Sequence, residues 1–167
     1  MKRRAAQISV IFAAIPALIF SASGVSFADS NNVSWKNVGT TRCLTWDTNY
    51  ITGAVDWLGT EDCSNHRGST RWRDVSVGAN RWQEKPAATN ISGNWVDVCL
   101  TAYWSSNGAS VYLEGCSPNN TWQQWEENWT GSAWRLKHVQ TGLFLDSNSS
   151  GSVYALSQNT GNNQLWQ

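Results

Sequence analysis

Charged side chains are scarce in this 167-residue chain and favour neither sign. Lysine and arginine number 12, aspartate and glutamate also number 12, and together they make up 14% of the residues. Binding along a nucleic-acid backbone requires a stripe of Lys and Arg that neutralises successive phosphates. The balanced composition therefore argues against nucleic acid as a partner. The 12 tryptophans are far more aromatic mass than a disordered chain usually carries, so they predict a folded domain.

Sequence motifs of the common hydrolases are missing. The chain has no G-x-S-x-G or H-E-x-x-H segment and only two histidines, His66 and His138. A glycoside hydrolase needs two opposed carboxylates, but the closest acidic pairs, Glu61-Asp62 and Glu126-Glu127, are neighbours in sequence, so their side chains diverge on a strand. We interpret them as solvated loop acids and predict no enzyme activity.

Metal ligands at a recognisable spacing are also missing. No C-x-x-C segment occurs, and the two histidines are isolated, so zinc ligation has no support in the sequence. We predict neither a bound metal nor a cofactor.

Long apolar runs are lacking, and the most extended one lies near the N-terminus. Residues 8–20 are almost all apolar, which is too short for a bilayer span of about 20 residues. Three cations at positions 2–4 precede this run, and Ser26-Phe27-Ala28 places small residues where signal peptidase reads them. We predict a signal peptide over residues 1–28 and a secreted domain over residues 29–167 that does not insert into a membrane. An uncleaved N-terminal anchor is the alternative.

All four cysteines lie in the predicted exported part, where disulfides can form. Four cysteines allow three connectivities. They fall into two well-separated pairs along the chain, which favours bridges from Cys43 to Cys63 and from Cys99 to Cys116. Closing loops of this size stabilises the folded state by about 3 kcal/mol each on the chain-entropy estimate.

An internal repeat is the most informative feature of the remaining sequence. Each of three copies has a short apolar C-L-T-like run, then a run containing valine, then a cysteine or its substitute, and finally a tryptophan. The third copy lacks both cysteines together, as expected if the sulfurs of each pair are bonded. We place the copies at about residues 33–75, 76–128 and 129–167. Corresponding positions are Cys43, Cys99 and Phe144; Cys63, Cys116 and Gln158; and Trp72, Trp125 and Trp166.

Short runs rich in Val, Leu and Tyr, bounded by Gly, Asn and Ser, recur through the copies and predict strands. No segment holds a 3.6-residue period over three turns, so we predict an all-β fold. The clearest runs are Val96–Leu100, Ser110–Leu113, Leu143–Leu145 and Ser152–Ala155.

The order of these elements resembles the ricin-type β-trefoil lectins. Gln123-Gln124-Trp125 and Gln164-Leu165-Trp166 match the Q-x-W signature of that family, whereas the first copy has Thr70 in the glutamine position. The resemblance covers about residues 33–167 and implies a β-trefoil with pseudo-threefold repeats, each able to hold one sugar in a shallow pocket. The recurring tryptophans and apolar positions are expected in the core, the latter being Leu44, Leu100, Leu145, Val55, Val111 and Val153.

The resemblance also indicates where a sugar would bind. In ricin-type sites the acid that closes C-L-D accepts sugar hydroxyls, and Asn or Gln at the start of Q-x-W offers an amide. The third copy alone keeps the acid, as Asp146, and it alone has Asn163 before Gln164. We predict one carbohydrate site there, for a galactoside or a polysaccharide, with Asp146 and Asn163 on a common open rim. Its residues are Asp146, Asn163, Gln164 and Tyr154.

Each of these residues also has a structural interpretation. Asp146 could stabilise the adjacent turn, Tyr154 could pack inward, and Gln164 could hold backbone groups. The first two copies carry Thr45 and Thr101 in place of the acid, and a hydroxyl cannot replace the charge-assisted acceptance of a carboxylate.

Aromatic residues follow those threonines in the first two copies. Trp46 comes after Thr45, and Tyr103-Trp104 follows Thr101 closely; they could form flat platforms for a polysaccharide or pack beneath loops. The alternative to a lectin is therefore a secreted β-trefoil that binds a protein, such as an inhibitor or a toxin-associated subunit. The sequence does not assign a role to Trp57, Trp82, Trp95, Trp129 or Trp134.

Overall fold

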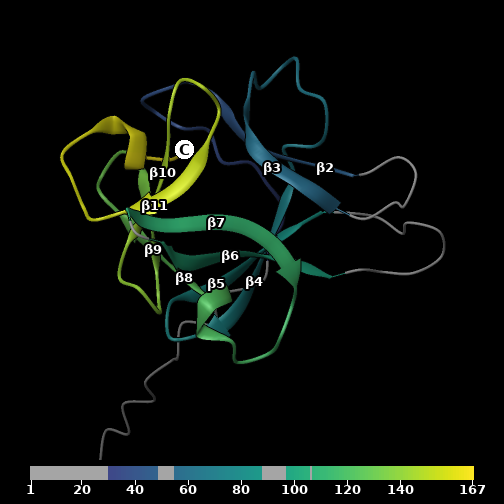
Figure 1. The fold of residues 1–167 in the computed structure, drawn as a ribbon, viewed down its shortest axis with the longest axis vertical. Coiled ribbons are helices and arrows are strands. Elements are labelled where there is room, and N and C mark those ends of the chain that lie inside the picture. Colours follow the sequence, from purple (N-terminus) through teal and green to yellow (C-terminus); the bar gives the residue numbers. More distant parts are fainter. Residues whose placement is uncertain (1–29, 49–54, 88–96, 106) are drawn as a thin grey trace, which may run out of the picture.

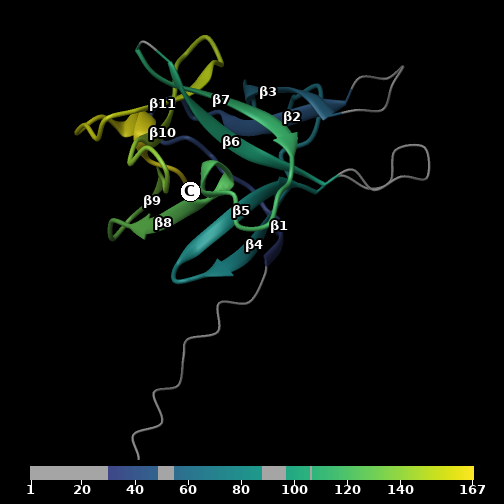
Figure 2. The ribbon, with the colours of Figure 1, turned by 60° about the horizontal axis from the view of Figure 1, so that its bottom comes forward.

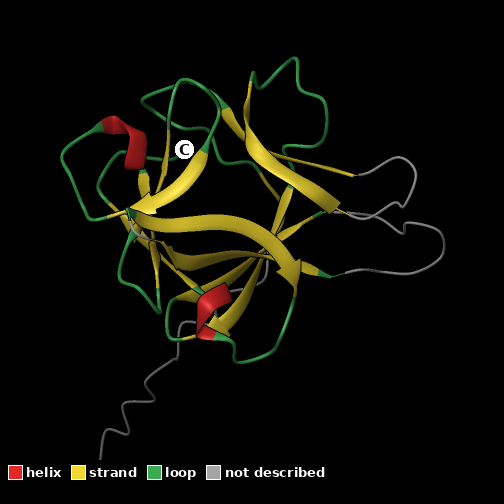
Figure 3. Cartoon of the chain, viewed as in Figure 1, coloured by secondary structure: helices red, strands yellow, loops and turns green. Residues whose placement is uncertain are grey.

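The computed structural model describes residues 30–48, 55–87, 97–105 and 107–167. The predicted signal peptide and Trp95 lie outside the described residues. Within those ranges, short strands follow one another along the chain and are interrupted by two single turns of 3-10 helix (Figure 1, Figure 3). No helix in the described ranges is long and apolar enough to cross a membrane.

The strands group into hairpins, and all strand pairs are antiparallel. Nine strands form one sheet in the order β1-β4-β5-β8-β9-β10-β11-β7-β6, and β2 pairs with β3 separately. Figure 2 shows the β4–β5 and β8–β9 hairpins next to each other, and β5 and β8 are hydrogen-bonded. The elements are β1 (Ser30–Val33), β2 (Cys43–Thr48), β3 (Val55–Glu61), β4 (Trp72–Gly78), β5 (Arg81–Pro86), β6 (Val98–Ser105), β7 (Gly108–Gly115), η1 (Thr121–Gln123), β8 (Trp125–Trp129), β9 (Trp134–His138), β10 (Phe144–Ser147), β11 (Val153–Leu156) and η2 (Asn162–Gln164).

The runs predicted as strands correspond to β6, β7, β10 and β11, with ends that differ by one to five residues. Val96 lies outside the described residues. The largest difference is at the hairpin of β6 and β7. Strand β6 continues to Ser105, β7 begins at Gly108, and the two strands pair along their whole length. Pairing between the two strands extends past the apolar residues, because backbone hydrogen bonds do not depend on the side chains.

The core confirms the repeat. Trp72, Trp125 and Trp166 are completely buried. The indole N–H of each donates to a leucine carbonyl in its own repeat: Trp72 to Leu44 at 3.0 Å, Trp125 to Leu100 at 2.9 Å and Trp166 to Leu145 at 3.1 Å. A buried indole N–H needs such a partner. The predicted core leucines are fully buried and Val55 is buried, whereas Val111 and Val153 are half-buried at the edge of the core.

Segments from the two ends of the described chain meet and close the structure. Lys36 and Gln167 exchange backbone hydrogen bonds of 2.7 and 2.8 Å. Trp166 makes isolated bridges both to Asn37 and to Trp134. The last tryptophan of the third repeat is therefore held between the beginning of the first repeat and the hairpin β8–β9.

The predicted disulfides are both present. Cys43 is bonded to Cys63 and Cys99 to Cys116, with Cα–Cα distances of 5.0 and 5.1 Å. Each bridge ties the first strand of its repeat to the segment that follows the second strand. The third repeat has no such covalent tie between β10 and the segment after β11.

Candidate functional site

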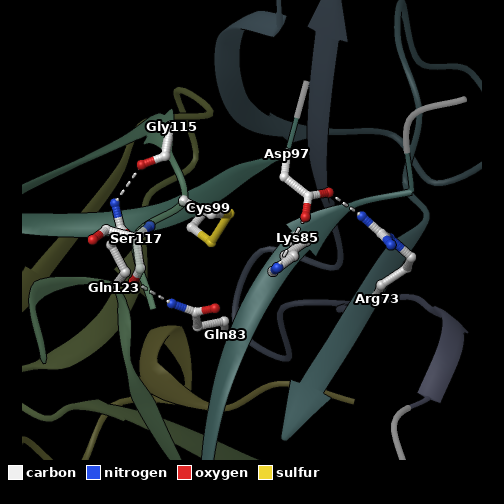
Figure 4. A network of polar contacts seen from close by, with 9 residues as sticks. Arg73, Gln83, Lys85, Asp97, Cys99, Gly115, Ser117 and Gln123 are labelled. Carbon is white, nitrogen blue, oxygen red and sulfur yellow. Dashed lines mark hydrogen bonds and ion pairs between the residues drawn. A yellow bond between two sulfur atoms is a disulfide. The ribbon is translucent and has the colours of Figure 1, made fainter. Parts of the chain in front are cut away.

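The glutamines of the two Q-x-W signatures make equivalent hydrogen bonds. Gln164 Nε2 donates to the Ser157 carbonyl at 3.0 Å, and its Oε1 accepts from the Asn159 N–H at 3.0 Å. Gln123 makes the same pair of contacts, with the Gly115 carbonyl and the Ser117 N–H (Figure 4). Gln164 is completely buried, so both ends of its amide hold the backbone of the loop after β11.

Asp146 lies in β10 directly opposite Tyr154 in β11. Its exposure is only 3%, so the prediction that it stands on a rim open to water is wrong. Burial raises the pKa of Asp146, and neighbouring groups, among them the side chains of Gln164, Asn159 and Tyr154, offset this only in part. Oδ1 of Asp146 has no hydrogen-bond partner. The carboxylate therefore lies among Gln164, Tyr154 and Asn159, the first two of which were predicted to share its site.

The first two repeats have a threonine at the position equivalent to Asp146. Thr45 Oγ1 donates to the Cys43 carbonyl at 2.9 Å, and Thr101 Oγ1 donates to the Cys99 carbonyl at 3.0 Å. Both threonines are fully buried and satisfied by their own strand. A carboxylate cannot donate in this way. Asp146 is thus an acid at a site where the fold itself accepts a neutral hydroxyl.

Asn163 is separated from the Asp146 group. Its carbonyl accepts from Asn37 Nδ2 at 2.7 Å, and its side chain approaches Gly39 so closely that a Cβ at position 39 would collide with Asn163 Oδ1. Asn163 is not among the groups that influence the carboxyl of Asp146. The structure therefore brings Asp146, Tyr154 and Gln164 together and places Asn163 against the turn after Asn37.

An open pocket of about 580 Å³ lies on the third repeat and the adjoining β8–β9 hairpin. Phe144, one of its walls, is two residues before Asp146 and therefore on the same face of β10. Gln158, another wall, immediately precedes Asn159. The lining consists of Glu126, Asn128, Trp129, Thr130, Arg135, Lys137, Phe144 and Gln158.

This pocket occupies the place of the missing disulfide. Phe144 and Gln158 stand at the repeat positions that Cys99 and Cys116 bridge in the second repeat. Without a covalent bridge, their side chains are free to form pocket walls. The paired loss of the cysteines was the sequence signal for this site, although we read it only as evidence for the disulfide pairing.

The rim of the pocket combines an aromatic surface with ionic and amide groups. Trp129 is 56% exposed and packs at 5.0 Å, at a tilt, against the ring of Trp134. Glu126 forms an ion pair with Lys137 at 3.5 Å, and Arg135 Nη1 donates to the Asn159 carbonyl at 2.9 Å. Trp129 could not be assigned a role from sequence, because the pairing of β8 with β9 brings it into the same pocket as Phe144 of β10.

Two other sequence interpretations need correction. Glu61, Glu126 and Glu127 are not solvated loop acids, because Glu61 lies in β3, the other two lie in β8, and all three are partly buried. Trp46 is not an exposed platform, because it is buried and its Nε1 donates to the Arg71 carbonyl at 2.7 Å. Tyr103 and Trp104 are more than half exposed on the β6–β7 hairpin.

The remaining tryptophans that the sequence left without a role divide between core and surface. Trp82 is buried, and Trp57 is half-buried under the guanidinium of Arg67 at 4.3 Å. His138 is also buried, with its ring nitrogens against Thr141 Oγ1 and the Trp122 carbonyl. Because both ring nitrogens are engaged in these contacts, we interpret His138 as a structural residue.

Comparison with known proteins defines the fold. No family model matches the chain. Among solved structures, it is similar to the designed threefold-symmetric protein ThreeFoil, at 20% identity and a TM-score of 0.62, over 82% of this chain and 96% of that one. It is also similar to SeviL, solved with an asialo-GM1 saccharide, at 14% identity and a TM-score of 0.57, over 81% of this chain and 94% of that one.

A third similar structure is the cytolethal distending toxin of Haemophilus ducreyi, at 19% identity and a TM-score of 0.58, with 81% of each chain covered. At these identities the likeness concerns the fold. The fold is a β-trefoil, as predicted, and it is shared by a protein solved with a bound saccharide and by a toxin.

Proposed function

We propose that this chain is a secreted, non-catalytic carbohydrate-binding domain whose sugar site is in the third repeat. The observation that carries the proposal is the open pocket in which the exposed face of Trp129 stands beside Glu126, Asn128, Arg135 and Lys137. Export is supported by the two disulfides, which form and persist in oxidising compartments, and by the predicted signal peptide.

A sugar ring suits this surface on chemical grounds. Its hydroxyls need fixed donors and acceptors, and its C–H face packs on an aromatic ring. Trp129 offers such a ring, Glu126 offers an acceptor, and the amides and cations of the lining offer donors. The pocket is shallow, so the affinity of one site is expected to be about millimolar, or about −4 kcal/mol. The proposed ligands are a galactoside or a polysaccharide.

The residues predicted from the ricin-type resemblance belong to the same proposal. Tyr154 is half-buried and covers Asp146. A saccharide that extends from Phe144 along β10 would have to displace Tyr154 or Asn159 to reach Oδ1 of Asp146. Asn163 and Gln164 would then act by shaping the loop, since their described contacts are with the backbone or with the Asn37 turn.

A glycan array followed by calorimetry tests the proposal. The protein should bind at least one glycan, and Trp129→Ala should abolish that binding. Trp104→Ala is the matched control, because Trp104 is 53% exposed on another hairpin, and it should bind normally. Asp146→Asn decides whether the saccharide reaches Asp146: a loss of affinity supports direct contact, and unchanged affinity confines the ligand to the pocket. The proposal fails if the protein binds no glycan.

A second candidate function is favoured by the β6–β7 hairpin. Tyr103, Trp104 and Tyr112 are exposed there, and aromatic residues of this kind are enriched in protein interfaces. The likeness to a toxin is compatible with a protein partner but concerns the fold alone. If this function holds, the protein should capture a specific secreted protein in a pull-down, and Trp104→Ala, not Trp129→Ala, should lose it.

A further inference from the structure

Three carboxylates from three adjacent strands converge at the junction of the first and second repeats. Asp74 in β4 is opposite Glu84 in β5, and Glu127 comes from β8, the neighbour of β5. Each offers one carboxylate oxygen to a group whose members all lie within 4.8 Å of one another. Asp74 and Glu84 are buried, Glu84 completely, and Glu127 is half-buried.

Oxygen atoms in this group are left without partners. Asp74 Oδ1, Glu84 Oε1 and Glu127 Oε1 are all buried and have no hydrogen-bond partner. One donor does reach the group, since Trp35 Nε1 binds Glu84 Oε2 at 3.0 Å. A buried carboxylate oxygen that lacks a donor is strongly disfavoured unless a proton or a cation compensates it.

Nearby cations do not compensate the group. Arg73 and Lys85, which adjoin Asp74 and Glu84 in sequence, point away and both pair with Asp97, at 2.7 and 3.2 Å (Figure 4). None of the ion pairs found in the described residues includes a member of the acidic group. Burial and the charge of Asp74 raise the pKa of Glu127 to about 7, and burial is the main cause that raises the pKa values of Asp74 and Glu84.

The β-trefoil itself does not require an acid at the centre of this group. Asp74 and Glu127 occupy equivalent places, each two residues after the conserved core tryptophan of its repeat copy. Opposite Asp74 stands Glu84, but opposite Glu127 stands Leu136, which is fully buried. An apolar side chain therefore fills the corresponding position in the next hairpin. Core packing alone therefore does not explain why position 84 is an acid.

We propose that Asp74, Glu84 and Glu127 bind a hard divalent cation, Ca²⁺ first, that links strands β4, β5 and β8. Ca²⁺ takes carboxylate oxygens at about 2.3–2.6 Å, so oxygens up to 4.8 Å apart can share one ion. Three acidic ligands match the preference of Ca²⁺ for oxygen, with water or second carboxylate oxygens filling the remaining positions. This site is separate from the sugar pocket and does not depend on it.

Terbium luminescence and thermal unfolding test the proposal on the chelator-treated protein. Tb³⁺ replaces Ca²⁺ and is excited by a close indole, and Trp35 contacts Glu84 directly. We expect saturable luminescence on adding Tb³⁺, its loss on adding excess Ca²⁺, and a rise in Tm with Ca²⁺ concentration. Glu84→Gln and Glu127→Gln should lose the luminescence and the Tm shift, whereas Asp62→Asn, which removes an exposed acid elsewhere, should keep both.

Glu84→Leu is a second variant in case Glu84→Gln does not fold. Leucine should be tolerated at position 84, because it already occupies the equivalent position 136. It should be folded and indifferent to Ca²⁺. The proposal is overturned if the chelated wild-type protein shows neither luminescence nor a Ca²⁺-dependent Tm. It is also overturned if the Asp62→Asn control and the Glu84 variants respond equally, since the ions would then bind elsewhere and the group would hold protons instead.

Discussion

Asp146 faces Tyr154 across the β10–β11 pair, and Oδ1 of its buried carboxylate has no hydrogen-bond partner. Repeats one and two place a satisfied threonine hydroxyl at the same position. Because threonine is accepted at this position in the other repeats, the fold does not require an acid there. It also gives a direct way to separate stability from function.

Replacing Asp146 by threonine should stabilise the protein by about 1–3 kcal/mol at pH 7, the usual penalty of an unsatisfied buried group. Because the pKa of Asp146 is raised in the folded state, the native protein binds the proton more readily than the unfolded chain does. The wild-type penalty therefore applies at neutral pH and shrinks as the pH falls toward the ordinary value of 3.8.

Urea unfolding of both proteins at pH 7 and pH 4 measures this difference. The reciprocal change Thr101→Asp is the control, and it should destabilise the protein because Thr101 loses its bond to the Cys99 carbonyl. Equal stability of Asp146→Thr and wild type at both pH values would contradict the assignment of a buried, unfavourable carboxylate.

His138 should make the fold sensitive to mild acid. Burial lowers its pKa below 6.5 in the native state, so the unfolded chain takes up a proton first. Stability is then complete above about pH 6.5 and falls as the pH drops below that value, by at most about 1.4 kcal/mol per pH unit. Chemical unfolding between pH 7.5 and 5 should show this slope, and His138→Gln should reduce it.

Gln164→Ala tests whether this glutamine holds the loop or contacts the sugar. Two backbone groups of the loop lose their partners, so stability should fall by about 1–3 kcal/mol, the net contribution of two hydrogen bonds. Gln123→Ala removes equivalent bonds, but the Cys99–Cys116 bridge still ties that segment, so we expect a smaller loss. Thermal and urea unfolding compare the two. A normal unfolding curve for Gln164→Ala, with lost glycan binding, would assign it to the sugar instead.

The double variant Cys99→Ser, Cys116→Ser should lose about 3 kcal/mol of stability and keep its glycan affinity. The loss follows from the freed loop of the unfolded chain, and the retention follows from the position of the pocket, which none of the cysteines lines. Calorimetry below the Tm of the variant measures the affinity. A drop in affinity at temperatures where the variant is fully folded would place the site nearer to the second repeat.

The sequence was sufficient for the architecture and for the disulfides. The recurrence of Trp72, Trp125 and Trp166 indicates the threefold repeat, because a buried indole with one fixed hydrogen bond fits few positions in a fold. The site was less accessible to sequence reasoning. Motif spacing placed Asp146 in the third repeat but could not show that Tyr154 and Gln164 cover it.

The pairing of strands in the sheet explains the residues that were missed. Trp129 lines the pocket through the pairing of β8 with β9 and of β9 with β10. Asp74, Glu84 and Glu127 meet only because β4, β5 and β8 are neighbours in the sheet. The spacing of Cys and His carries no information about carboxylates that are far apart in sequence, so it could not indicate this group.

The reciprocal hydrogen bonds between Lys36 and Gln167 place the start of the first repeat beside the end of the third. A circularly permuted gene, with a short linker joining these ends and a new opening in another loop, should consequently encode the same molecule. Evolution or a protein engineer could thus exchange which repeat is synthesised first.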